Sequence, residues 1–158
     1  MDLELKDKFL GLWDRYFPGA ALPLAFFYAD DPGDAEPSPV VEEFRCLAGA
    51  LNPVRAGRSR CFDADRIGCF GGKRYAGFGQ ELMPGFEYFL SYGIPGQLEG
   101  ERYKKSPELV LEMMKTAPTF AAPARWLVFK RWDRLDERDS PEAAVFFAPP
   151  DVLAGLFS

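Results

Sequence analysis

Basic side chains and cysteines gather in one stretch of the sequence, between Arg55 and Arg74. This stretch holds six basic residues against two acidic ones, a local charge of +4 in a chain whose net charge is −5. Cationic groups around a thiol favour its thiolate form, which is the nucleophile and the metal ligand of cysteine. The sequence therefore predicts that chemistry, if the chain performs any, centres here, with Cys69 as the candidate catalytic nucleophile.

Glycines lie on both sides of Cys69. They let a ligand approach the backbone closely, and exposed N–H groups can hold an anion. We therefore predict a pocket for a small molecule, an anion or a cofactor. Its candidate ligand-binding residues are Gly68, Gly71, Gly72, Lys73, Arg74, Arg60, Arg66 and Tyr75. The same pattern also fits a glycine-rich surface turn with solvated arginines and structural cysteines, and the sequence leaves both interpretations open.

The cysteines are also candidate metal ligands, with Cys69 and Cys61 as the pair in the basic stretch. The three cysteines are separated by 15 and 8 residues, which does not match the short gap usual in zinc and iron–sulfur motifs. An iron–sulfur cluster or another metal remains an alternative cofactor, with further ligands drawn from elsewhere. Cys46 falls on the apolar face of a predicted helix, so we expect it in the core.

Two common phosphate-binding motifs do not fit the glycines. After Gly72 and Lys73, Arg74 stands where a phosphate loop needs Ser or Thr to bind magnesium. The Gly77-Phe78-Gly79 run lacks the third glycine of a dinucleotide-binding turn. The chain has no histidine, so it cannot itself supply a Ser–His or Cys–His catalytic pair.

Hydrophobic periodicity indicates the elements that must position these residues. We predict helices over 5–16, 40–51, 83–92 and 107–117, and a last one opened by Pro149-Pro150-Asp151, with Asp151 as its cap. We predict strands over 22–28, 58–62, 125–132 and 143–148, and a loop or short helix over 68–79. The predicted fold class is α/β (α+β): one domain over 1–158, with a mixed β-sheet and helices packed against it.

Composition narrows the function classes. The chain has 158 residues, 47% of them hydrophobic, and lacks both a signal peptide and an apolar run long enough for a membrane span. We expect a cytoplasmic protein without membrane contact. The acidic balance is unfavourable for nucleic acid, which needs a basic face. Fifteen Phe are typical of a core built on rings, and the aromatic segment 86–92 would suit a homo-oligomer surface.

The run Cys69-Phe-Gly-Gly-Lys-Arg-Tyr-Ala-Gly-Phe resembles the C-x-G-G-x-x-Y-x-G signature of the uncharacterised ArCR family, domain of unknown function 169. The resemblance continues in the stretches 90–96, 99–107, 129–135 and 144–153, and it covers most of the chain from about Leu22 onward. It implies a shared fold and an important Cys69, but no reaction. Family members tend to be longer, so the resemblance also implies that this chain is the N-terminal part of a longer family domain.

Three functions follow as hypotheses. The first is a binding module for a small molecule, anion or cofactor, with a Cys/Gly/Arg-rich site. The second is a redox enzyme that depends on a thiol, a metal or an iron–sulfur cluster. The third is a non-catalytic oligomerisation or interaction protein. A polar loop with Glu99, Glu101, Arg102 and Tyr103 is a further candidate for facing a pocket, although a solvated loop has the same composition.

Overall fold

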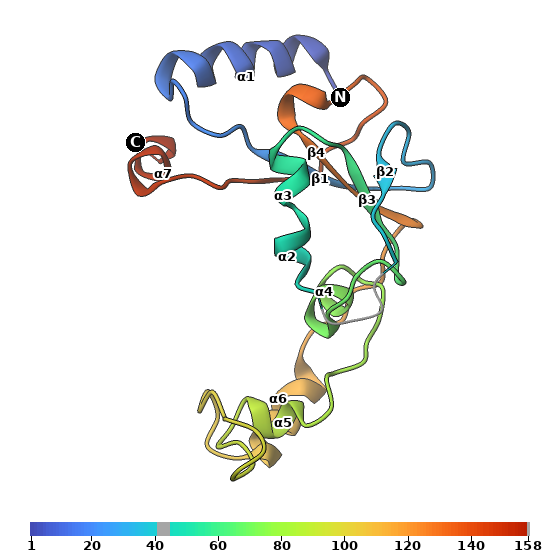
Figure 1. Cartoon of the computed structure of the whole chain (residues 1–158), viewed down its shortest axis with the longest axis vertical. Coiled ribbons are helices and arrows are strands. Elements are labelled where there is room, and N and C mark those ends of the chain that lie inside the picture. Colours follow the sequence, from blue (N-terminus) through green and yellow to red (C-terminus); the bar gives the residue numbers. More distant parts are fainter. Residues whose placement is uncertain (41–44, 158) are drawn as a thin grey trace. The chain divides into compact units, whose positions relative to one another are not determined.

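A computed structural model describes residues 1–40 and 45–157. The chain forms two compact units, which are described here one at a time (Figure 1). The first unit comprises Met1–Cys69 and Ala122–Ser158, and the second comprises Phe70–Ala121. Among the described residues, no helix is both long enough and apolar enough to cross a membrane.

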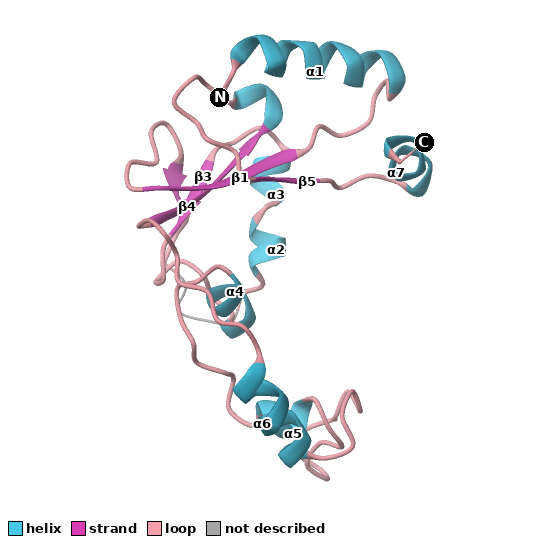
Figure 2. Cartoon of the chain, turned by 180° about the vertical axis from the view of Figure 1, so that it is seen from behind, coloured by secondary structure: helices cyan, strands magenta, loops and turns pink. Residues whose placement is uncertain are grey.

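The first unit is built on a mixed five-stranded sheet, which confirms the predicted sheet (Figure 2). In space the strand order is β2-β3-β4-β1-β5. Antiparallel pairs join β4 to β1, β4 to β3 and β1 to β5, whereas β2 pairs with β3 in parallel. The strands are β1 (Leu24–Ala29), β2 (Glu36–Pro37), β3 (Arg60–Phe62), β4 (Trp126–Arg131) and β5 (Ala143–Val145).

The core of this unit lies around the central strand β4. Leu127 and Val128 have no exposed surface, and Phe129 meets Phe62 and Phe26 edge to face, at ring-centroid distances of 5.9 and 5.5 Å. Edge-to-face contacts suit the charge distribution of aromatic rings and add to the energy of burial. The expectation of a core built on rings is therefore confirmed for the sheet.

Helix α1 (Leu3–Tyr16) begins where the sequence predicts, because the Asp2 carboxylate accepts hydrogen bonds from the backbone N–H groups of Glu4 and Leu5. It packs on the sheet unit through rings. Phe9 lies 4.9 Å from Trp132 of the short 3₁₀ helix η1 (Trp132–Arg134), measured between centroids.

The helix predicted over 40–51 is wrong in part. The structure has two short helices instead, α2 (Leu47–Ala50) and α3 (Asn52–Arg55), while residues 41–44 of the prediction lie outside the described residues. Cys46 precedes α2 in an extended conformation and is exposed, so its expected place in the core is also wrong. A side chain on an extended residue does not share the apolar face of the helix that follows.

The last helix, α7 (Pro150–Leu156), forms as predicted, but its cap does not. Pro149 occupies the cap position, and Asp151 lies inside the first turn. There the carboxylate still interacts favourably with the positive end of the helix dipole.

The second unit consists of three short helices and the turns between them. They are α4 (Phe70–Tyr75), α5 (Phe86–Phe89) and α6 (Pro107–Thr116). The start of α6 confirms its prediction, since the Ser106 hydroxyl accepts a hydrogen bond from the Leu109 N–H and Pro107 takes the first turn.

A buried lysine fastens the loops of the first unit to the sheet. Lys130, on β4, is only 1% exposed, and its ammonium lies 2.6 Å from Asp34, 2.9 Å from Asp139 and 3.6 Å from Asp136. Burial acts to lower the pKa of Lys130, but hydrogen bonds to Asp34 and Asp139 outweigh it and raise that pKa above its usual value. The lysine is therefore a structural cation that ties the 30–36 and 132–139 loops together.

Candidate functional site

A cavity of about 430 Å³ opens in the first unit, between the end of β2, helix α2 and the start of β3. Its size is within the range of small-molecule pockets. The lining combines two cations with hydroxyl, thiol and apolar groups. It consists of Ser38, Pro39, Arg45, Cys46, Gly49, Ala50, Pro53 and Arg60.

Arg60 is held in this wall by the sheet. The parallel register places Arg60 opposite Glu36, and its guanidinium lies 2.9 Å from that carboxylate. Only 17% of the Arg60 side chain is exposed, against 69% for Glu36. Among the described residues this is the one ion pair that Arg60 makes, so most of its N–H donors remain available to a ligand in the cavity.

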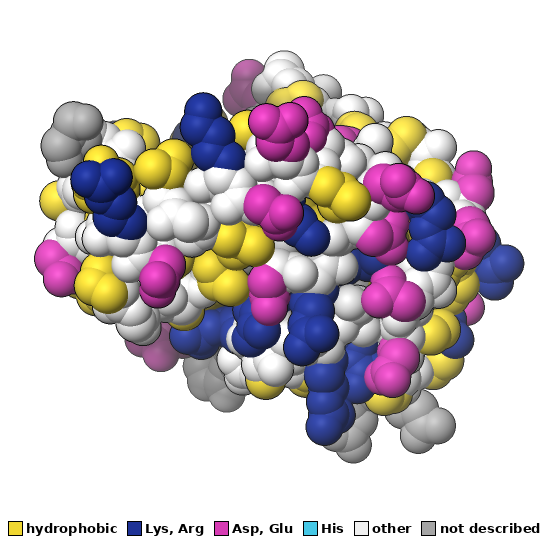
Figure 3. All heavy atoms as spheres, turned by 90° about the horizontal axis from the view of Figure 1, so that it is seen from above, with side chains coloured by type: hydrophobic (Ala, Val, Ile, Leu, Met, Phe, Trp, Pro, Cys, Tyr) yellow, Lys and Arg dark blue, Asp and Glu magenta, His cyan; other side chains and the backbone are white. Residues whose placement is uncertain are grey.

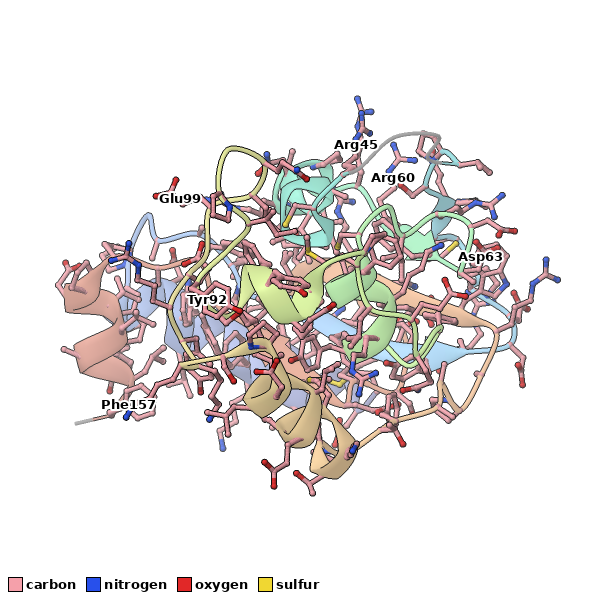
Figure 4. All side chains as sticks on the ribbon, turned by 90° about the horizontal axis from the view of Figure 1, so that it is seen from below. Arg45, Arg60, Asp63, Tyr92, Glu99 and Phe157 are labelled. Atoms are coloured by element: carbon pink, nitrogen blue, oxygen red, sulfur yellow. The ribbon has the colours of Figure 1, made fainter. Side chains whose placement is uncertain are left out.

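Arg45 and Cys46 form the part of the wall that precedes α2. Both are exposed, and neither takes part in an ion pair or disulfide within the described parts of the chain. Figure 4 shows Arg45 and Arg60 at the same side of the molecule, with Arg45 extending outward. With Glu36 balancing Arg60, the described lining keeps an excess of positive charge through Arg45, in a chain of net charge −5.

A backbone hydrogen bond connects this cavity to the residues before Cys69. The Arg45 N–H donates to the Gly68 carbonyl oxygen at 3.4 Å. Gly68 thus lies beside the cavity wall, and Cys69, which follows it, is partly exposed. The role predicted for Cys69 stays a prediction.

Cys61, the other candidate metal ligand, is a core residue. Its side chain has no exposed surface, and its thiol donates to the Ala35 carbonyl oxygen at 3.5 Å. Burial raises the pKa of Cys61 to about 11, despite the guanidinium of Arg66, which acts to lower it. At neutral pH Cys61 is therefore a protonated thiol.

Arg66 makes contacts that hold the turn after β3. Its Nη1 donates to Asp63 at 2.6 Å, and its guanidinium lies over the Trp126 ring at 5.4 Å from the centroid. The Nε atom is buried and has no hydrogen-bond partner among the described residues. These contacts give Arg66 a role in packing the turn, whereas Arg60 faces the cavity.

The remaining predicted ligand-binding residues lie on α4 in the second unit, where the sequence expected a loop or short helix. Tyr75 is 84% exposed. The Arg74 guanidinium donates to the backbone and side-chain oxygens of Gln80, at 2.9 and 3.3 Å. A side chain at Gly71 would meet open space, and Lys73 packs its stem near Gly79.

No three Cys, Asp or Glu side chains converge in a metal-binding arrangement within 1–40 and 45–157. The metal and cluster alternatives therefore have no geometric support from the described residues.

The second unit has a cavity of its own, of about 400 Å³, formed by the loop 92–102. Arg102 lines it with a positive φ of 55°, an uncommon conformation for a residue with a side chain. Figure 4 shows Tyr92 and Glu99 on this same loop. The lining holds one cation and one carboxylate, Arg102 and Glu99, so it lacks the charge excess of the first cavity.

Sequence reasoning found Arg60 but missed most of the first cavity. Its other wall comes from Ser38, Pro39 and the turn of α2, which carry no chemical motif. The one available signal was the Arg45-Cys46 pair, a cation beside a thiol that lies outside the basic stretch.

Comparison with known families gives a match over most of the chain. The sequence pattern described as uncharacterised ArCR, domain of unknown function 169, matches residues 20–158. This confirms the resemblance drawn from the motif around Cys69. No curated protein and no solved structure matches the chain.

Proposed function

We propose that this chain, which belongs to the uncharacterised ArCR family, binds a small molecule with an anionic group in the cavity between β2, α2 and β3. The observation that carries the proposal is the state of Arg60, a largely buried guanidinium on the cavity wall whose one ion pair among the described residues is with Glu36. A cation in such a position has already lost much of its hydration. An anion that enters the cavity replaces the missing water contacts with charge-assisted hydrogen bonds.

The other residues of the cavity wall indicate which chemical groups the ligand carries besides its anionic group. Pro39, Ala50 and Pro53 present apolar surface, and Ser38 adds a hydroxyl donor. A phosphate or carboxylate attached to a compact apolar body would therefore match the cavity better than a bare inorganic ion. Arg45 lies at the exposed side, where a second cation attracts the ligand over a longer range.

The test uses phenyl phosphate, a dianion with a small apolar ring. We expect its addition to shift amide NMR signals of Gly49, Ala50 and Arg60. Replacing Arg60 by Gln removes a charge-assisted hydrogen bond and should weaken binding by about tenfold or more. The matched control is Arg58→Gln, because Arg58 is an exposed cation on the same segment and does not line the cavity.

Two results would contradict the proposal. One is a set of shifted signals that leaves out Gly49 and Ala50. The other is an equal loss of affinity in both variants, which would mean that general charge rather than the cavity attracts the ligand.

A second function, thiol-dependent chemistry, is supported by Cys46. Its thiol is exposed on the wall of the cavity with Arg45 and Arg60 as the cations. In this alternative Cys46 supplies the reactive thiol beside the bound anion. Cys69 is the other accessible thiol.

Alkylation with iodoacetamide tests this alternative by comparing the three thiols. At neutral pH, Cys61 should stay unmodified until the protein unfolds, since its pKa of about 11 keeps it protonated and its surface is buried. Cys46 should react first, and phenyl phosphate should slow that reaction because it occupies the same cavity. Peptide mapping gives the order. A Cys46 rate unchanged by saturating phenyl phosphate would remove the thiol from the site.

A further inference from the structure

Helix α1 exposes an apolar stripe that the fold of its own chain does not use. Leu5, Leu12 and Tyr16 are 56%, 44% and 61% exposed. At about 100° per residue, these three positions fall within about 40° of one another around the helix. They therefore lie along one side of the helix, and large exposed apolar side chains that share one side are typical of an interaction surface.

The face of α1 that packs on its own unit is different. Trp13 is buried there, with its ring centroid 5.1 Å from that of Phe17 and 5.8 Å from that of Phe146. The Lys6 ammonium donates to the Leu135 carbonyl oxygen at 3.1 Å on the same side. The attachment of α1 to the sheet is thus complete without the stripe.

Charged residues flank the stripe in a pattern that complements itself. Glu4 lies near the start of α1 and Arg15 near its end, and both project from the same flank of the stripe, as does Lys8 between them. Within the described residues neither Glu4 nor Arg15 forms an ion pair, although Arg15 lies over the ring of its neighbour Tyr16. Figure 3, seen from above the view of Figure 1, shows that apolar, acidic and basic side chains are interspersed on this face of the molecule.

We propose that α1 pairs antiparallel with α1 of a second copy of this chain, around a two-fold axis near the middle of the helix. Antiparallel pairing brings Leu5 of one copy opposite Tyr16 of the other, with Leu12 near the axis. Flanking residues on the same side then meet, so that Glu4 of each copy faces Arg15 of the other. The surface is self-complementary, as a two-fold interface requires.

The size of the contact sets its strength. A helix of 14 residues is about 21 Å long, and the stripe contributes three large apolar side chains from each copy. This is a small interface, so we expect a dimer that dissociates on dilution. Helix α1 contributes no residue to the lining of the proposed anion site, so pairing does not depend on that site.

Sedimentation equilibrium over a wide concentration range tests the pairing. The mass should rise from the 17.7 kDa of one chain toward twice that value as concentration increases. Leu12→Glu places a charge near the axis and should keep the protein monomeric. Circular dichroism identifies any variant in which α1 is lost.

Charge exchange then tests the geometry. Glu4→Arg and Arg15→Glu should each raise the dissociation constant by about tenfold, and the double exchange should restore it, because the pairs form again with reversed sign. Asp7→Arg is the matched control, since it makes the same charge change on the exposed side away from the stripe.

A wild-type protein that stays monomeric throughout would overturn the proposal. So would a dimer that persists in Leu12→Glu, because it would use another surface. Failure of the double exchange to restore pairing would exclude the antiparallel arrangement, and none of these results depends on phenyl phosphate binding.

Discussion

The two units of this protein are held in shape by different physical means. The first has a sheet whose central strand is buried on both faces and carries an ion network around Lys130. Among the described residues of the second, few apolar side chains are buried, chiefly Ala76, Val110 and Pro107. Apolar burial contributes roughly 25 cal/mol for each Å² removed from water, so the first unit has the larger store of stabilising energy.

In the second unit, backbone hydrogen bonds and close backbone contacts provide a larger share of the stabilisation. After α5, the chain returns on itself through hydrogen bonds from Glu101, Arg102 and Lys104 to the carbonyl oxygens of Phe89, Ser91 and Leu90, at 2.7 to 2.9 Å. Such a loop keeps its shape only while the two backbone segments can remain in close contact. The comparison indicates that a substitution should destabilise the first unit mainly by removing a charge pair, and the second unit mainly by steric overlap.

The largest effect is expected at Lys130. Lys130→Met keeps most of the apolar stem but leaves the buried Asp139 carboxylate without its cation. Removal of one partner from a buried ion pair costs about 3–5 kcal/mol of folding free energy. Urea unfolding followed by tryptophan fluorescence measures this, because all three tryptophans, at 13, 126 and 132, belong to the first unit.

Arg138→Met is the control for Lys130→Met. It also removes a cation that pairs with an aspartate of this network, Asp136, at 3.1 Å, but the Arg138 side chain is 69% exposed. An exposed pair contributes at most about 1 kcal/mol. Equal losses in the two variants would break the comparison, because burial would then not decide the cost.

The sheet was predictable from sequence because its strands are short runs of apolar and aromatic residues bounded by turn residues. β1 and β4 lie within a few residues of the predicted strands, and α1 and α6 were marked by their caps, Asp2 and Ser106. Local chemistry was sufficient in these cases. The cap predicted at Asp151 was wrong, because the cap position is taken by Pro149 and the helix begins two residues earlier than a cap at Asp151 would place it.

The site was harder to predict because its walls come from segments distant in sequence. Arg60 reaches the cavity only because β2 and β3 pair in parallel. Strand β2 has two residues, which is too short for a periodic pattern to predict. The sequence also gives Cys61 and Cys69 the same basic surroundings. Strand register, which places Cys61 opposite Val128 inside the sheet, is a long-range property that decides its burial.

A smaller effect is expected from the glycines of the second unit, where matched positions sharpen the comparison. Gly93 and Gly96 have nearly the same backbone, with φ of 78° and 72°. A Cβ at Gly93 would overlap the Leu98 carbonyl oxygen, whereas a Cβ at Gly96 meets nothing within 4 Å. Gly96→Ala should therefore lower the free energy of unfolding only by the strain of a left-handed alanine, about 1–2 kcal/mol. Gly93→Ala should lower it clearly more, because the steric overlap adds to this strain.

Hydrogen exchange of backbone amides resolves where that cost falls. In the wild-type protein the Ile94 amide donates to the Leu98 carbonyl oxygen at 2.7 Å, and the Leu98 amide donates to the Ile94 carbonyl oxygen at 2.9 Å. Both amides should lose protection in Gly93→Ala. The amides of β4 should keep theirs, because the sheet does not rely on this turn. Equal protection in the two alanine variants would mean that the Gly93 approach is not what holds the loop, and the second unit would then need another source of order.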